Sequence, residues 1–192
     1  MLNRRFQFSF VWLIGLVLVA AGSTNLYAKA APKRPPIEIS SSITIVESPD
    51  DPEPIRRATD DLIRDFGNVF GRQPERVDDL EDAGPVAILI SEGNRVHPGI
   101  KCLTTTDPES FAFSVLRVPG HQPLKHLVCL TGADVRGTIY AVYQFSQSVL
   151  GVDPMYLWTD KQPEKRESIV LPADFEHAYA KPGFRYRGFF IN

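Results

Sequence analysis

The sequence has few of the residues that mark several common protein classes. Its 192 residues include two cysteines, Cys102 and Cys129, and contain no block of lysines and arginines. The formal net charge is −2 at neutral pH, so the composition does not favour a nucleic-acid partner. The two cysteines leave two interpretations open, a disulfide in an oxidising compartment or buried free thiols.

Motifs for metal and cofactor chemistry are also missing. Residues 132–138 join a predicted strand to a predicted helix but lack the lysine of a phosphate loop. We instead expect Gly132 to allow a tight turn, Asp134 to cap the helix and Gly137 to permit close packing. No metal-ligand spacing links the four histidines, which are His97, His121, His126 and His177.

Paired acids are present, but they are neighbours in sequence on predicted surfaces, as in Asp60-Asp61. Cleavage of a glycosidic bond needs two carboxylates held on opposite sides of that bond, so we interpret these pairs as solvated surface. No serine has the sequence context of a nucleophile. We therefore predict no metal, no cofactor and no catalytic residue within this chain.

The longest apolar run lies at the N-terminus. Arg4 and Arg5 precede it, and Ala28 and Ala30 form a small-x-small cleavage pattern after it. This order is typical of a secretory signal peptide. An uncleaved anchor is the alternative, but the 12 strongly apolar residues at 10–21 fall short of the roughly 20 that span a bilayer. We expect cleavage after residue 30, a periplasmic or secreted product, and no stable membrane anchor after cleavage.

Residues 37–160 have the patterns of one α/β domain, preceded by a flexible leader at 31–36. Apolar residues at steps of three and four predict a helix that ends at Gly71 and a second that ends at Gly151. Charged residues, Asp65 among them, are expected on the outer face of the first helix. Alternating or continuous apolar residues predict strands at 37–46, 86–90, 111–118 and 124–130. The order predicts a mixed β-sheet with two packed helices.

Within this pattern, 86–90 is expected to be buried on both faces and 111–118 to be half-buried. The polar segment 72–84 is expected to be a surface connection, and 161–184 a linker. Residues 188–191 are predicted to form a hydrophobic strand, and the chain ends at Asn192 with nothing after that strand to pack it. We therefore expect a truncated chain.

Aromatic residues gather after Gly151, with Tyr156 and Trp158 in one segment and Phe184, Tyr186, Phe189 and Phe190 near the end. Such side chains could stack on sugar rings, and packing at a domain junction is the alternative interpretation.

Three segments together resemble the N-terminal region of glycoside hydrolase family 115, the xylan α-1,2-glucuronidases. They are Leu130-Thr131-Gly132-Ala133-Asp134-Val135-Arg136-Gly137-Thr138-Ile139-Tyr140-Ala141-Val142-Tyr143, Gly151-Val152-Asp153-Pro154-Met155-Tyr156-Leu157-Trp158-Thr159-Asp160, and Tyr186-Arg187-Gly188-Phe189-Phe190-Ile191-Asn192. The N-terminal domains of family 67 glucuronidases and family 20 hexosaminidases are similar. Met155 and Leu157 depart from the bulkier aromatics often found in family 115.

The resemblance implies a hexosaminidase/glucuronidase N-terminal-domain-like fold, followed at 185–192 by the first strand of a missing (β/α)8 barrel. In that family the catalytic carboxylates belong to the barrel, whose active site lies at the C-terminal ends of its strands. Only Asn192 matches a position near the sugar pocket, so the resemblance implies a substrate-binding role for Asn192.

Two hypotheses follow for function. The first is a non-catalytic N-terminal domain of an exported glycoside hydrolase of α-glucuronidase type, whose polysaccharide or oligosaccharide partner would bind through the missing barrel. The second is a stand-alone exported domain that binds carbohydrate or another protein.

Overall fold

Six strands form the main sheet of the domain, and their bounds are β2 Thr44–Val46, β3 Glu75–Val77, β4 Val86–Glu92, β5 Phe111–Arg117, β6 His126–Gly132 and β8 Glu176–Tyr179. In the computed structural model they run in the order β3-β2-β4-β6-β5-β8. β2, β3, β4 and β6 are parallel, while β5 is antiparallel to both β6 and β8. The predicted mixed sheet is therefore confirmed. The structure describes residues 35–93, 100–120, 122–184 and 188.

A second, two-stranded sheet pairs β1 (Ile37–Ile39) with β7 (Ile169–Leu171) in antiparallel register. The prediction of one strand over 37–46 is therefore wrong. A turn closed by the hydrogen bond from Ile43 N to Ser40 O, 3.2 Å long, separates β1 from β2. The prediction of a linker at 161–184 is also corrected, because β7 and β8 lie within it and pair with β1 and β5.

Helix α1 (Glu53–Phe70) follows the predicted apolar stripe. It begins beside a proline, whose missing N–H costs nothing in the first turn, and it ends at Gly71 in a left-handed conformation with φ 77°. One prediction for this helix is wrong: Asp65, expected on the outer face, is buried. The stripe facing the sheet comprises Ile55, Ala58, Leu62, Phe66 and Val69.

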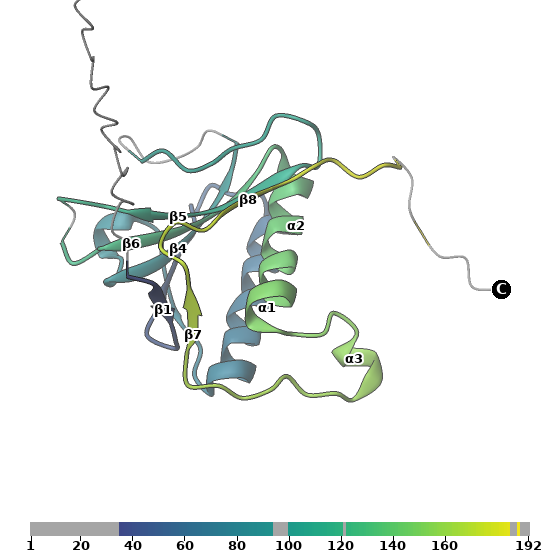
Figure 1. Cartoon of the computed structure of the whole chain (residues 1–192). Coiled ribbons are helices and arrows are strands. Elements are labelled where there is room, and N and C mark those ends of the chain that lie inside the picture. Colours follow the sequence, from purple (N-terminus) through teal and green to yellow (C-terminus); the bar gives the residue numbers. More distant parts are fainter. Residues whose placement is uncertain (1–34, 94–99, 121, 185–187, 189–192) are drawn as a thin grey trace, which may run out of the picture. The chain divides into compact units, whose positions relative to one another are not determined.

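Helix α2 (Val135–Phe145) lies beside α1 on one face of the sheet (Figure 1). It continues into a π-helical turn, η2 (Ser146–Leu150), that ends at Gly151 as predicted. The predicted cap is confirmed, because Gly137 N donates to Asp134 Oδ1 over 2.8 Å. A short helix, α3 (Tyr156–Thr159), follows.

The sheet has a hydrophobic core on each face. Under α1 and α2, Phe113 packs edge-on against Phe145 with ring centroids 6.0 Å apart. The opposite face is covered by loops and by η1 (Leu80–Asp82), a 3-10 turn whose Leu80 is buried. Hence 72–84 is more than the predicted surface connection, since it supplies both β3 and η1.

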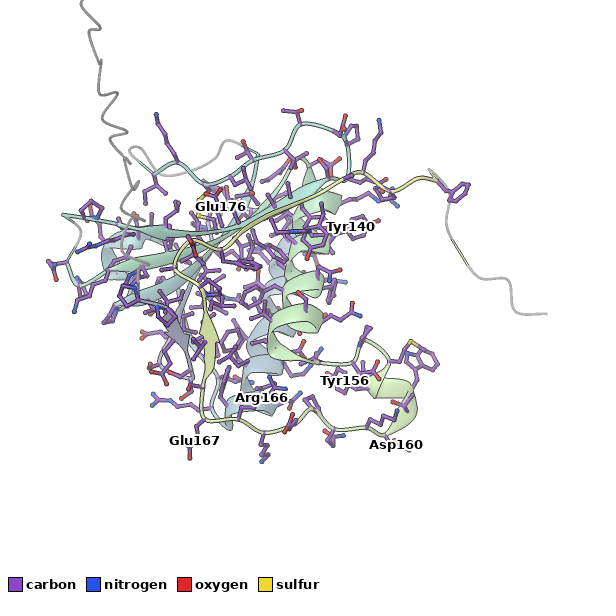
Figure 2. All side chains as sticks on the ribbon, in the orientation of Figure 1. Tyr140, Tyr156, Asp160, Arg166, Glu167 and Glu176 are labelled. Atoms are coloured by element: carbon purple, nitrogen blue, oxygen red, sulfur yellow. A yellow bond between two sulfur atoms is a disulfide. The ribbon has the colours of Figure 1, made fainter. Side chains whose placement is uncertain are left out.

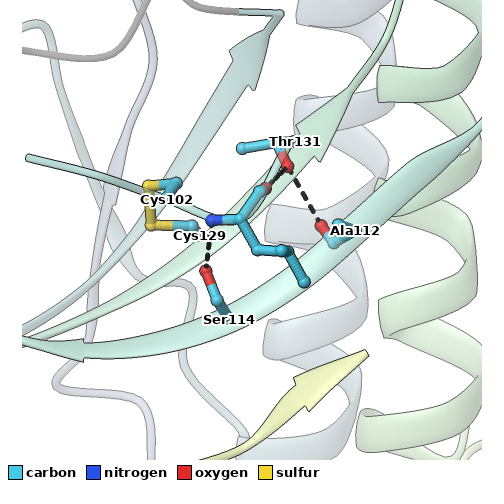
Figure 3. Close-up of a disulfide and its surroundings, with 6 residues drawn as sticks. Cys102, Ala112, Ser114, Cys129 and Thr131 are labelled. Carbon is cyan, nitrogen blue, oxygen red and sulfur yellow. Dashed lines mark hydrogen bonds between the residues drawn. A yellow bond between two sulfur atoms is a disulfide. The ribbon is translucent and has the colours of Figure 1, made fainter. Parts of the chain in front are cut away.

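The loop at 100–105 covers part of this opposite face (Figure 3). A disulfide joins Cys102 to Cys129 of β6, which resolves the two interpretations left open by the sequence. Leu103 N donates to Ser114 Oγ over 3.1 Å, and Thr131 Oγ1 donates to Leu103 O over 2.5 Å. Because of this cover, β5 is buried on both faces over 111–115, whereas half-burial was predicted. β4 is buried on both faces as predicted.

The predicted signal peptide at 1–30, most of the leader, and Asn192 lie outside the described residues, as do seven of the eight residues at 185–192. No helix in the part of the chain that the structure describes is long and apolar enough to cross a membrane.

Candidate interaction surface

A buried carboxylate connects α1 to the segment that follows α2. Asp65 is 4% exposed, and Ser146 Oγ of η2 donates a hydrogen bond to its Oδ2. Burial raises the pKa of Asp65 above its ordinary value, and the hydrogen bond from Ser146 opposes that rise. Asp65 therefore joins α1 to η2 through a buried hydrogen bond.

A second set of contacts extends this network toward solvent. Tyr143 OH donates to Asp61 Oδ2 over 2.6 Å, and Arg64 Nη1 lies 2.8 Å from Asp61 Oδ1. Burial and the bond to Asp61 raise the pKa of Tyr143 to about 12, so this phenol stays protonated and donates throughout the physiological range. Asp61 was expected to be solvated surface, but it holds α2 against α1.

Tyr156 connects the same network to α3. Its hydroxyl accepts a hydrogen bond from Arg64 Nε over 3.2 Å and donates to Asp65 Oδ1 over 3.5 Å. Figure 2 labels Tyr156 in the segment that leaves the end of α2. The ring is partly buried against the helices. Tyr156 therefore fixes α3 in place, and its ring is not the open stacking platform that the sequence left as one interpretation.

Three apolar side chains beside Tyr156 point into solvent. Met155 is 53% exposed, Leu157 70% and Trp158 81%. We call these three residues the α3 surface. Adjacent apolar side chains this exposed mark interaction sites more often than isolated ones do. Because Tyr156 anchors the helix, the α3 surface is presented by a fixed element.

Phe184 belongs to the described part of the chain. Phe184, the first of the predicted terminal aromatics, is 78% exposed. Tyr186, Phe189, Phe190 and the predicted substrate-binding residue Asn192 lie outside the described residues.

The loop after β6 holds no space for a phosphate. Asp134 fills the N-terminus of α2 with its own carboxylate, since Oδ2 also accepts from Glu109 N over 2.9 Å. Gly137 approaches the backbone so closely that a Cβ there would lie 2.3 Å from Ser110 O. The structural roles expected for Asp134 and Gly137 are confirmed.

Glu47 is a buried carboxylate that sequence analysis did not identify. Glu47, just after β2, is 2% exposed and accepts a hydrogen bond from Thr59 Oγ1 over 2.5 Å. Nη1 of Arg76, in β3, lies 3.5 Å from Oε2 of Glu47. Burial raises the pKa of Glu47, while Thr59 and Arg76 oppose the rise. Both partners are distant in sequence, so no local pattern could have identified the contact.

The buried carboxylates of Asp65 and Glu47 therefore stabilise the fold through hydrogen bonds to other side chains. Among the described residues, no group of three His, Cys, Asp or Glu side chains is placed to hold a metal ion.

Replacing Asp65 with asparagine is expected to remove a pH-dependent contribution to the free energy of unfolding. The raised pKa means that the folded state favours the protonated carboxyl, so the contribution of Asp65 is most favourable below the unfolded value of 3.8 and is lost as pH rises through the folded pKa. The D65N chain should therefore gain stability relative to the parent between acid and neutral pH. Urea unfolding of both chains across that range measures the difference, and D50N serves as an exposed control outside this network. Parallel stability curves for D65N and the parent would contradict the assignment.

Comparison with solved structures identifies the fold. The domain matches a family GH115 4-O-methyl-α-glucuronidase with specificity for decorated arabinogalactans, at 23% identity and a TM-score of 0.58, over 75% of this chain and 18% of that one. An N-acetyl-β-hexosaminidase from Streptomyces plicatus matches at 14% identity and a TM-score of 0.43, over 73% of this chain and 22% of that one. Neither a family model nor a curated protein sequence matches the chain.

The first of these matches supports the fold that the sequence predicted, an N-terminal-domain-like fold of glycoside hydrolases. The chain spans about a fifth of the length of both solved structures.

Proposed function

We propose that this chain is the non-catalytic N-terminal domain of an exported glycoside hydrolase of α-glucuronidase type, which acts on plant-type polysaccharide. The observation that carries the proposal is the fold match to the family GH115 enzyme over three quarters of the chain. The motif segments at 130–143 and 151–160, from which the resemblance was drawn, lie within the described domain. Export would bring such a protein to polysaccharides that are too large to import.

The site geometry supports a non-catalytic role. Asp65 and Glu47, the carboxylates with raised pKa values, are both buried and hydrogen-bonded to side chains of the fold. A general acid for glycoside cleavage must reach the scissile oxygen, and neither carboxylate is open to a substrate. The chemistry is therefore assigned to a barrel beyond this domain.

One observation favours the second function, a stand-alone exported binding domain. Trp158 and Leu157 are strongly exposed on an anchored helix, and exposed tryptophan is a common contact residue for sugars and proteins. In a glycoside hydrolase, the same surface would instead face another part of the enzyme. The coding sequence after the Asn192 codon separates the two functions, since the first requires a barrel there, in frame or displaced by a frameshift.

Export and inactivity are tested on the expressed chain. Mass spectrometry of the secreted product is expected to show a chain that begins at Ala31, and replacing Ala28 and Ala30 with leucine should block that cleavage. The purified product should release no glucuronic acid from glucuronoxylan. Measurable release would overturn the non-catalytic assignment, and retention of an intact N-terminus inside the cell would overturn export.

A further inference from the structure

A pocket lies at the hairpin that joins β5 to β6, and it shares no residue with the α3 surface. Its volume is about 470 Å³, which falls within the roughly 300–1,000 Å³ of small-molecule sites. Two exposed prolines contribute to its lining, Pro119 from the hairpin and Pro35 from the segment before β1, and Ala173 from the connection between β7 and β8 also lines it. The pocket thus has an apolar component built from segments far apart in the sequence.

Three basic side chains share this pocket. Arg117 and His126 are direct partners in the antiparallel pairing of β5 with β6, so their side chains lie on the same face of the sheet. Lys125 precedes His126 and also lines the pocket. The backbone here is held by bonds from Val118 N to Lys125 O (3.0 Å) and from Lys125 N to Pro85 O (2.8 Å). The bases are therefore carried by a fixed strand pair.

The positive charge in the pocket is not neutralised. In the part of the chain that the structure describes, neither Arg117 nor Lys125 forms an ion pair. The pKa of His126 is lowered by burial and then by the charges of Arg117 and Lys125, with no carboxylate acting in the opposite direction. The contributions of Arg117 and Lys125 to this lowering are what a positive local potential produces.

We propose that this pocket binds a carboxylated sugar, such as a hexuronate residue of an acidic polysaccharide. Guanidinium and ammonium groups form charge-assisted hydrogen bonds with a carboxylate, and the apolar face of a sugar ring can lie on the exposed Pro35 and Pro119. A simple anion would contact only the basic side chains of the pocket, and a neutral sugar would contact only its apolar lining. The choice of a uronate rests on the proposed function.

Titration of the full chain by NMR tests the proposal with sodium glucuronate as the probe. Glucuronate is expected to shift the backbone amide signals of Arg117, Lys125 and His126. Glucose, which has the same ring without the carboxylate, should bind at least tenfold more weakly, and so should inorganic phosphate. These comparisons use the unmodified chain, so they do not depend on the folding of any variant.

A charge-matched pair of variants locates the site. The R117Q/K125Q chain should bind glucuronate at least tenfold more weakly than the parent. The R56Q/K161Q chain removes two exposed charges outside the pocket and should bind as the parent does. Equal binding of phosphate, equal binding of glucose, or unchanged binding in R117Q/K125Q would each overturn the proposal. A barrel missing from the coding sequence would instead overturn the glycosidase assignment and leave a measured uronate site intact.

Discussion

A chain carrying Gly132→Ala is expected to be largely unfolded. A Cβ built on Gly132 would lie 1.9 Å from Thr138 N and 2.4 Å from the carbonyl carbon of Gly137. Both are backbone atoms of the first turn of α2, so no side chain can rotate to make room. Either β6 or α2 would have to move, and each has core residues packed on it.

The expected cost of G132A is more than about 4 kcal/mol, in the range reached only by severe substitutions. Such a loss removes much of the roughly 5–15 kcal/mol by which a domain is stable. Circular dichroism and urea unfolding measure it. Gly183→Ala is the matched control, because a Cβ there meets nothing within 4 Å, and its unfolding midpoint should stay near that of the parent. A G132A chain with the parent's midpoint would show that α2 does not pack this closely on β6.

This turn could be predicted from sequence because its causes are local. Gly132, Asp134 and Gly137 lie within six residues of one another, and each has a role fixed by its own backbone position. The same holds for α1, whose stripe is visible as steps of three and four, and for β4, which is a continuous apolar run bounded by turn residues. Where the signal and its cause share one segment, sequence alone was sufficient.

The short edge strands could not be predicted in the same way. β8 reads Glu176-His177-Ala178-Tyr179 and has no apolar alternation. It becomes a strand because β5 offers an open edge more than 60 residues earlier in the chain. β7 and β1 likewise depend on each other across most of the domain. Strand pairing of this kind is a property of the assembled fold, so the segment at 161–184 resembled a linker.

The candidate surface was predicted only in part, for a related reason. The concentration of aromatic residues after Gly151 is evident in the sequence, but their separate roles are not. Tyr156 is held by Arg64 and Asp65, about 90 residues earlier in the chain, whereas Trp158 meets solvent. Burial of Asp65 similarly depends on Ser146, 81 residues away.

Loss of the Cys102–Cys129 disulfide is the second large effect that we expect. The two cysteines are 27 residues apart in sequence. Closing a loop of that length restricts the unfolded chain enough to stabilise the folded state by about 3–4 kcal/mol. The bridge also fixes the loop at 100–105 over the core that contains Leu127 and Cys129. Its loss should therefore weaken the cover of part of this face of the sheet.

The C102A/C129A chain is accordingly expected to unfold at a temperature roughly 10 °C lower than the parent, given about 2–4 °C per kcal/mol for a domain of this size. Chemical reduction of the parent should give a similar loss.

Ser114→Ala separates the effect of the bridge from that of the loop contacts, because it removes the acceptor for Leu103 N and leaves the disulfide intact. That variant should lose only about 1 kcal/mol. If S114A destabilised the chain as much as removal of both cysteines, the hydrogen bonds of the loop would be its main attachment. Equal melting temperatures for the parent and C102A/C129A would show that the bridge adds no stability.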